Sequence, residues 1–199
     1  AKHGVWNDDC SVAVAGIDVL GVFFRKDMFN GGEGEEGRAW DVIVSMLVHP
    51  SVEVKLKAVA LVGGNLRNVR SLYEVARNLT RSIDYEAASL TDELERRVVE
   101  GVVGVMVEME RREMEKRGKT TKRGKVVEPE DECEEKSLHW MMKRLVGIAT
   151  NASDGGLRRR LAFRCFLGIL SSEGKKDWIG SYAETIIEPL QRALKEDEN

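Results

Sequence analysis

The sequence predicts an all-α fold, and three observations support this prediction. Apolar residues recur at intervals of three and four along most of the chain, whereas alternation with period two is scarce. The 199 residues include only 3 prolines and 6% aromatic residues, too few for the many turns and strands of a β-sandwich or barrel. The hydrophobic fraction of 42% is high enough to form a packed core, which excludes a disordered chain.

About eight helices follow from the apolar stripes and the breaks between them. One early stripe comprises Val12, Ile17, Leu20 and Phe24. Glycine-rich segments at 30–37 and 151–156 and the His49-Pro50 pair interrupt the pattern, and Ser51 is placed to cap the helix that follows. The predicted helices cover residues 9–25, 38–48, 51–67, 71–82, 90–117, 136–150, 156–171 and 177–195.

A small residue followed four or five positions later by an apolar residue recurs along the chain, at Gly16, Ala58, Gly101 and Ala162. The interval is 42 residues from Gly16 to Ala58 and 43 residues from Ala58 to Gly101. The interval from Gly101 to Ala162 is 61 residues, and it becomes about 43 if 118–135 is an insertion. A period near 42 with two helices per unit is typical of HEAT and armadillo repeats. We therefore predict an α-solenoid, with helical repeats in 1–117 and 136–199 and a disordered charged insertion in 118–135. The alternative is four unrelated helices that carry small residues by chance.

The two ends of the chain favour a segment of a longer array. The first predicted helix matches the inner helix of a repeat, and the last contains Pro189, as outer HEAT helices do. A free solenoid needs polar capping units, and neither end carries an obvious one. We expect the chain to be a fragment of a larger protein and to self-associate when isolated.

The overall charge excludes some partners. Lys and Arg number 31 against 34 Asp and Glu, so the whole chain carries no field that attracts nucleic acid or an anionic membrane. No apolar run approaches the roughly 18 residues of a membrane span, and no signal peptide is apparent. The three cysteines are far apart, which fits a reducing compartment and predicts neither a disulfide framework nor a cysteine zinc site.

One segment combines a block of cations with a block of acids. Six lysines and arginines lie within 116–125, and six acidic residues follow within 128–135. Such a segment cannot bury enough apolar area to fold. The cations suit a nuclear import signal or an arm that contacts RNA phosphates, and the alternative is a solvated linker whose halves neutralise each other. The cations are Lys116, Arg117, Lys119, Lys122, Arg123 and Lys125.

A second basic cluster falls on predicted helices. Arg158, Arg159 and Arg160 are consecutive, Arg164 follows one turn later, and Lys143 and Arg144 lie on the preceding helix. Consecutive arginines spread widely around a helix, so at least two must meet solvent, a carboxylate or a phosphate. Pairing with acids of adjacent helices and contact with RNA or another partner both remain open at this level.

No arrangement of residues predicts catalysis. His3, His49 and His139 stand apart, and none belongs to a zinc-binding pair. The sequence contains no phosphate loop, nucleophile elbow or metal-spaced carboxylate set. We predict no catalytic residue, metal, cofactor or small-molecule substrate, while an apolar pocket with convergent carboxylates of perturbed pKa would favour an enzyme.

Several segments resemble the C-terminal region of the DRIM family, very large HEAT-repeat proteins associated with the U-three small nucleolar RNA. The resemblance covers 137–195, with a weaker match over 42–67. Unlike the family, this chain has no tryptophan after its His-Pro turn and lacks the basic C-terminal extension, so RNA contacts made by that extension would lie beyond it. The matching segments are LHWMMKRL at 138–145, Arg159-Arg160, FRCFLG at 163–168, YAETIIEPL at 182–190 and LVHPSVEVK at 47–55.

The resemblance implies a nucleolar scaffold of the small-subunit processome that is required for pre-rRNA processing. Its expected partners are processome proteins together with pre-rRNA or small nucleolar RNA, and no membrane. A different hypothesis is a HEAT-repeat adaptor in nucleocytoplasmic transport or signalling, which would bind peptides instead of RNA.

Overall fold

A computed structural model describes residues 10–26, 33–86, 91–123, 138–151 and 156–171, together with positions 187, 188, 191 and 195. The described part is all-helical and contains seven helices and no strand, which confirms the predicted class. The eighth predicted helix lies outside the described residues except for those four single positions. The helices are α1 (Cys10–Lys26), α2 (Glu33–Met46), α3 (Val52–Gly64), α4 (Leu72–Glu86), α5 (Asp92–Arg123), α6 (Leu138–Thr150) and α7 (Gly156–Leu170).

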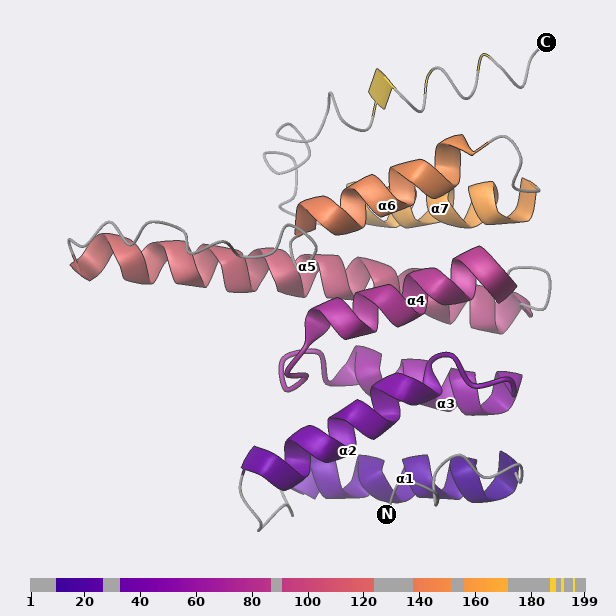
Figure 1. The fold of residues 1–199 in the computed structure, drawn as a ribbon, viewed down its shortest axis with the longest axis vertical. Coiled ribbons are helices and arrows are strands. Elements are labelled where there is room, and N and C mark those ends of the chain that lie inside the picture. The colour runs from indigo at the N-terminus through magenta and orange to yellow at the C-terminus, as the bar shows by residue number, and fades with distance from the viewer. Residues whose placement is uncertain are drawn as a thin grey trace.

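The helices form two stacked layers (Figure 1). Helices α1, α3, α5 and α7 make one layer, in which each helix contacts the next. Helices α2, α4 and α6 make the other layer, and each packs on the helix that follows it in the chain. The arrangement is therefore a stack of helical hairpins, α2–α3, α4–α5 and α6–α7, with α1 at one end (Figure 1).

Serine and threonine residues begin several of these helices. The hydroxyls of Ser71 and Thr91 accept hydrogen bonds from the N–H groups of Glu74 and Leu94, each at 3.3 Å. Ser51 occupies the N-cap position of α3 as predicted, with an extended backbone, but its side chain makes no capping bond. Its N–H instead donates to Nδ1 of the buried His49 at 3.1 Å, which ties the turn to the helix start.

Three of the four predicted small residues are buried in the α3–α5–α7 layer, and one of them, Gly101, lies at a close approach. Ala58 and Ala162 are fully buried. A Cβ at Gly101 would lie 3.2 Å from Leu79 of α4 and 3.6 Å from Val59 of α3. The prediction for Gly16 is wrong, because no atom lies within 4 Å of a Cβ there, and Gly21 faces Leu61 of α3 instead.

The predicted stripe on the first helix is also wrong at one residue. Val12 is 46% exposed, whereas Ala13 and Ile17 are buried. The stripe that packs on α3 runs through Ala13, Ile17 and Gly21, so Val12 and Gly16 each lie one residue, about 100° around the helix, away from it.

Polar side chains join neighbouring helices of the second layer. The Asn78 amide on α4 donates to the Val44 carbonyl at 2.9 Å, and the Ser82 hydroxyl donates to the Leu47 carbonyl at 3.1 Å. Val44 lies in the last turn of α2 and Leu47 directly follows the helix, a region where carbonyls lack the usual i+4 backbone donor. Asn78 and Ser82 are buried and satisfy these acceptors without water.

Helix α5 is longer than predicted. It spans 32 residues and ends at Arg123, so the expectation of a disordered insertion from 118 onward is wrong for residues 118–123. Lysine and arginine are good helix formers, and extending an existing helix carries no nucleation cost. Helical structure therefore continues through the first six residues of the predicted insertion, and residues 124–135 lie outside the described part of the chain.

The close contact at Gly101 predicts a large effect of substitution. Gly101→Leu should lower the free energy of unfolding by about 2–3 kcal/mol, because the side chain must displace Leu79 and Val59. Gly147→Leu on α6 is the matched control, since a Cβ there meets nothing within 4 Å and leucine favours the helix. Urea denaturation followed by circular dichroism measures both variants. Equal destabilisation of the two would contradict the packing role of Gly101.

The environment of His49 predicts a dependence of stability on pH. Burial, assisted by the charge of Lys55, lowers the pKa of His49 below its ordinary 6.5. Below pH 6.5 the unfolded chain therefore binds a proton on this residue that the folded chain does not bind, and the free energy of unfolding falls as the pH falls. Urea denaturation between pH 7.5 and about pH 5 should show this loss.

The His49→Asn variant should show a shallower loss over the same pH range. Its amide oxygen can still accept the Ser51 N–H bond, but the side chain does not titrate. Parallel stability profiles of the variant and the parent chain would exclude His49 as the source of the effect.

Candidate partner-contacting surface

Two of the clustered arginines of α7 bind one buried carboxylate. Nη2 of Arg160 donates to Oε2 of Glu95 at 2.8 Å, and Nη1 of Arg164 donates to Oε1 of the same residue. Glu95 is 2% exposed, whereas more than half of each arginine side chain is exposed. Glu95 lies in the first turn of α5, so this cluster joins α5 to α7.

The other clustered cations occupy different environments. Nε of Arg159 donates to the Ala149 carbonyl at 3.0 Å, which satisfies an acceptor at the C-terminal end of α6. Arg158 and Arg144 are half-buried, and each makes an interaction with its surroundings. Lys143 is exposed on α6.

Arg160 and Arg164 thus form ion pairs with an acid of an adjacent helix, which is one of the two alternatives that the sequence left open. Bonding to Glu95 leaves an exposed part of both guanidinium-bearing side chains, so it does not prevent an additional contact with a phosphate. Contact of Arg158, Arg159, Arg160, Lys143 and Arg144 with RNA or another partner stays a prediction.

Glu95 was not identified from the sequence, although a signal was present. It lies next to Leu94 and precedes Val98 and Val102 by three and seven residues, so it belongs to the same helical face as buried apolar residues. A carboxylate on such a face must find a charged or hydrogen-bonding partner. The sequence does not reveal that this partner comes from a helix 65 residues away.

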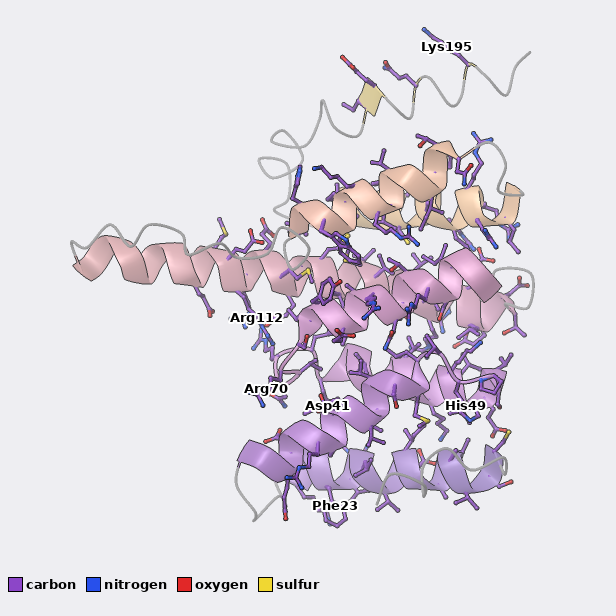
Figure 2. All side chains as sticks on the ribbon, viewed as in Figure 1. Phe23, Asp41, His49, Arg70, Arg112 and Lys195 are labelled. Carbon is purple, nitrogen blue, oxygen red and sulfur yellow. The ribbon has the colours of Figure 1, made fainter. Side chains whose placement is uncertain are left out.

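A second buried carboxylate of α5 organises the loop between α3 and α4. Glu108 is 8% exposed and accepts hydrogen bonds from Arg111 and Arg112, and the bond from Arg111 contributes most to lowering its pKa. Nη2 of Arg112 also donates to the carbonyls of Leu66, Arg67 and Val69 at 2.8–3.2 Å. Figure 2 shows Arg112 on the same side of the stack as Arg70 and opposite His49.

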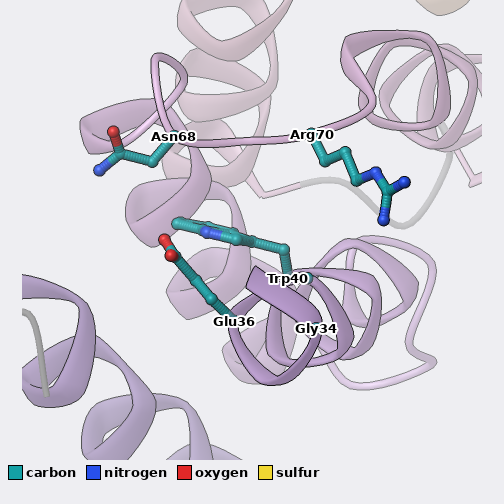
Figure 3. A pocket seen from close by; sticks show the side chains of 6 residues that line it. Gly34, Glu36, Trp40, Asn68 and Arg70 are labelled. Atoms are coloured by element: carbon teal, nitrogen blue, oxygen red, sulfur yellow. The ribbon is translucent and has the colours of Figure 1, made fainter. Parts of the chain in front are cut away.

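A cavity of about 470 Å³ opens beside this loop, between its Asn68 and Arg70 and the first turns of α2 (Figure 3). Its lining includes Trp40, which is 2% exposed and stacks on Phe24 with ring centroids 4.0 Å apart. The buried indole N–H of Trp40 has no hydrogen-bond partner among the described residues. Glu36 adds a carboxylate to the lining. The described walls therefore offer donors and one acceptor for a polar group, an arrangement that sequence analysis did not indicate.

Most of the predicted cation block lies on the end of α5. Lys116, Arg117, Lys119, Lys122 and Arg123 have helical backbones, whereas Lys125 lies outside the described residues. Figure 1 shows this end of α5 extending beyond the other helices of the stack. The block is therefore carried on a helix for most of its length, which differs from the expected disordered loop.

Within the described residues, no group of three or more His, Cys, Asp or Glu side chains is arranged to hold a metal ion. None of the helices there is both long and apolar enough to cross a membrane. Cys165 on α7 is buried, and this burial raises the pKa of its thiol to about 12.

The sequence and the structure were compared with known families, curated proteins and solved structures. No family model, curated protein or solved structure matches the chain.

The Glu95 cluster predicts asymmetric effects of substitution. The double variant Arg160→Gln/Arg164→Gln leaves a buried carboxylate without a charged partner, and should lower the free energy of unfolding by about 2–4 kcal/mol. Adding Glu95→Gln removes the buried charge and should restore most of that loss. Arg158→Gln is the control within the same turn. Urea denaturation measures the free energy of unfolding of these variants. If the triple variant is no more stable than the double variant, the pairing role of Glu95 is contradicted.

Proposed function

We propose that the chain is part of a non-catalytic HEAT-repeat scaffold of the small-subunit processome, which supports pre-rRNA processing in the nucleolus. Two features support the proposal: the resemblance to the DRIM family over 137–195, and the stacking of helical hairpins in two layers. The scaffold would act by geometry, holding RNA and assembly factors at fixed separations.

The repeat assignment is supported by the positions of the small residues. Ala58, Gly101 and Ala162 lie on α3, α5 and α7, each the second helix of a hairpin. The interval between Gly101 and Ala162 exceeds the others, and the extra residues include the end of α5 that projects from the stack (Figure 1). A HEAT unit with an extended second helix therefore accounts for the irregular interval.

The position of the cation block is the single observation that carries the RNA-contacting role. Five lysines and arginines follow one another between Lys116 and Arg123 on a projecting helix, away from the packed layers. RNA phosphates attract such a cluster because binding releases condensed counterions. The helix is an element on which charged groups keep a regular spacing, so it suits contact with a backbone of regularly spaced phosphates.

A protein adaptor in transport or signalling is a second candidate function, and the cavity at Trp40 favours it. The Asn68 amide and the Arg70 guanidinium could donate to peptide carbonyls, while Glu36 could accept from peptide N–H groups. Such a chain would retain its protein partners after all RNA is removed.

Crosslinking of the full-length protein in cells, followed by sequencing of the attached RNA, tests the main proposal. Recovery of pre-rRNA and small nucleolar RNA is the expected result. Recovery of protein partners without either RNA would overturn it and favour the adaptor.

The projecting helix predicts a specific loss of RNA affinity. Lys122→Gln/Arg123→Gln should weaken binding of single-stranded RNA and reduce the slope of log K against log salt by about 1.4, since each phosphate contact contributes ~0.7. Arg77→Gln/Arg81→Gln on α4 is the matched control, because it removes two exposed cations from another helix. Fluorescence anisotropy over a salt series measures both. Equal effects of the two double variants would indicate non-specific attraction only.

A further inference from the structure

Two threonines of the chain follow an arginine by three residues. Thr80 follows Arg77 and Thr120 follows Arg117, and no other serine or threonine of the sequence has an arginine at this spacing. Serine/threonine kinases select their acceptors by the charge pattern around them, and one large class requires an arginine at this position. The structure places the two threonines in different surroundings.

Thr80 lies on α4 and is closed to a kinase. It is 2% exposed, and its hydroxyl lies within hydrogen-bond distance of the carbonyls of Ala76 at 2.9 Å and Arg77 at 3.0 Å. A phosphate at this position would bring about two negative charges into the packed helices, which is costly without cationic partners. The fold therefore excludes this match as an acceptor.

Thr120 lies at the other extreme, near the end of the longest described helix. It has a helical backbone three residues before Arg123, the last residue of α5. Figure 1 shows this end of α5 extending beyond the other helices of the stack. A kinase can therefore approach the backbone around Thr120 without separating the packed layers.

The end of α5 also opens at little cost. Gly118 and the adjacent Thr120 and Thr121 are poor helix formers, glycine by about 1 kcal/mol and threonine by up to about 0.7 kcal/mol relative to alanine. The ends of helices open far more easily than their packed centres. Local opening of these turns would let a groove bind the acceptor segment in an extended form.

The residues around Thr120 set what a phosphate would do there. Five cations and no acid lie between Lys116 and Arg123. Positions 116, 117 and 123 are three or four residues from position 120, so they are its neighbours on a helix. A phosphate carries about −1.5 to −2 charges at pH 7, so one phosphate lowers the charge of this block from five to about three.

We propose that Thr120 is a phosphorylation site for a kinase that requires a preceding arginine, and that its phosphorylation releases RNA from the end of α5. The proposal rests on the RNA-contacting role proposed above for this end. The added phosphate competes with RNA phosphates for the neighbouring cations. It also places negative charge near the C-terminal end of a helix, where the helix dipole disfavours it and destabilises the last turn.

The transfer itself needs ATP as the phosphoryl donor. The Thr120 hydroxyl oxygen attacks the γ-phosphorus, and the bond from that phosphorus to the oxygen bridging the β-phosphorus breaks as the new O–P bond forms. ADP leaves, and the hydroxyl proton passes to the carboxylate base of the kinase. Nothing is oxidised or reduced.

Treatment of the purified 199-residue chain with ATP and the catalytic subunit of cyclic-AMP-dependent protein kinase tests the site. Peptide mass spectrometry should find phosphate on Thr120 and none on Thr80. Arg117→Gln should slow incorporation at least about tenfold, whereas the matched control Arg77→Gln should leave the rate unchanged. Incorporation at Thr80, or none at Thr120, would overturn the proposal.

Fluorescence anisotropy with a labelled single-stranded oligouridine tests the release. The phosphorylated chain should bind at least about tenfold more weakly at about 0.1 M salt. The slope of log K against log salt should fall by about 1.4, because one phosphate offsets about two cations at ~0.7 each. Thr120→Ala treated with the same kinase is the control, since it keeps every cation and should bind RNA as the untreated parent chain does.

The outcomes separate this proposal from the function on which it rests. Equal RNA affinity of the phosphorylated and untreated chains would overturn the release. If the untreated chain does not bind RNA, the RNA-contacting role of α5 fails and the release fails with it, while mass spectrometry alone still decides whether Thr120 is the acceptor.

Discussion

The central constraint on this fold is that α5 must bury carboxylates, Glu95 and Glu108 among them, while contacting helices on several sides. It packs against α3, α4, α6 and α7, and both Glu95 and Glu108 lie on its buried surface. Burying an ionised carboxylate is costly unless it is paired, so each acid has two arginine partners. The arginines that bind Glu95 belong to α7 and so attach that helix to α5. One of the arginines that bind Glu108, Arg112, also donates to carbonyls of the α3–α4 loop. The positions of those two elements thus depend on charges that belong to α5.

This constraint also bears on how the surface can act. Arginines that satisfy Glu95 are held in place before any partner arrives, which lowers the entropy lost when a partner binds. The end of α5 extends beyond the stack, and Lys116, Arg117, Lys119, Lys122 and Arg123 lie along its helical backbone (Figure 1). The proposed scaffold would therefore combine a fixed arginine cluster on α7 with a projecting basic helix, each offering a different geometry to RNA or to a protein.

Much of the fold could be predicted because an amphipathic helix requires apolar residues at intervals of three and four, and this spacing is visible in the sequence. Apolar spacing located all seven described helices, and the predicted small residues Ala58, Gly101 and Ala162 are buried, Gly101 at a close approach of helices. The errors at Val12 and Gly16 arose because α1 is apolar on two faces, so spacing alone cannot say which face packs on α3. The predicted end of α5 was wrong because charge density was interpreted as disorder, although lysine and arginine are compatible with a helix.

Sequence alone determined the helical class, the approximate positions of the helices and the two basic clusters, since all of these depend on neighbours within a few residues. Only the tertiary structure decided which arginines meet Glu95, which carbonyls Arg112 binds and where Trp40 forms a cavity. These contacts join residues far apart in the chain, and many side chains of the same type could serve as partners. Packing selects among them because only some orientations of the helices close the core while pairing the buried acids Glu95 and Glu108.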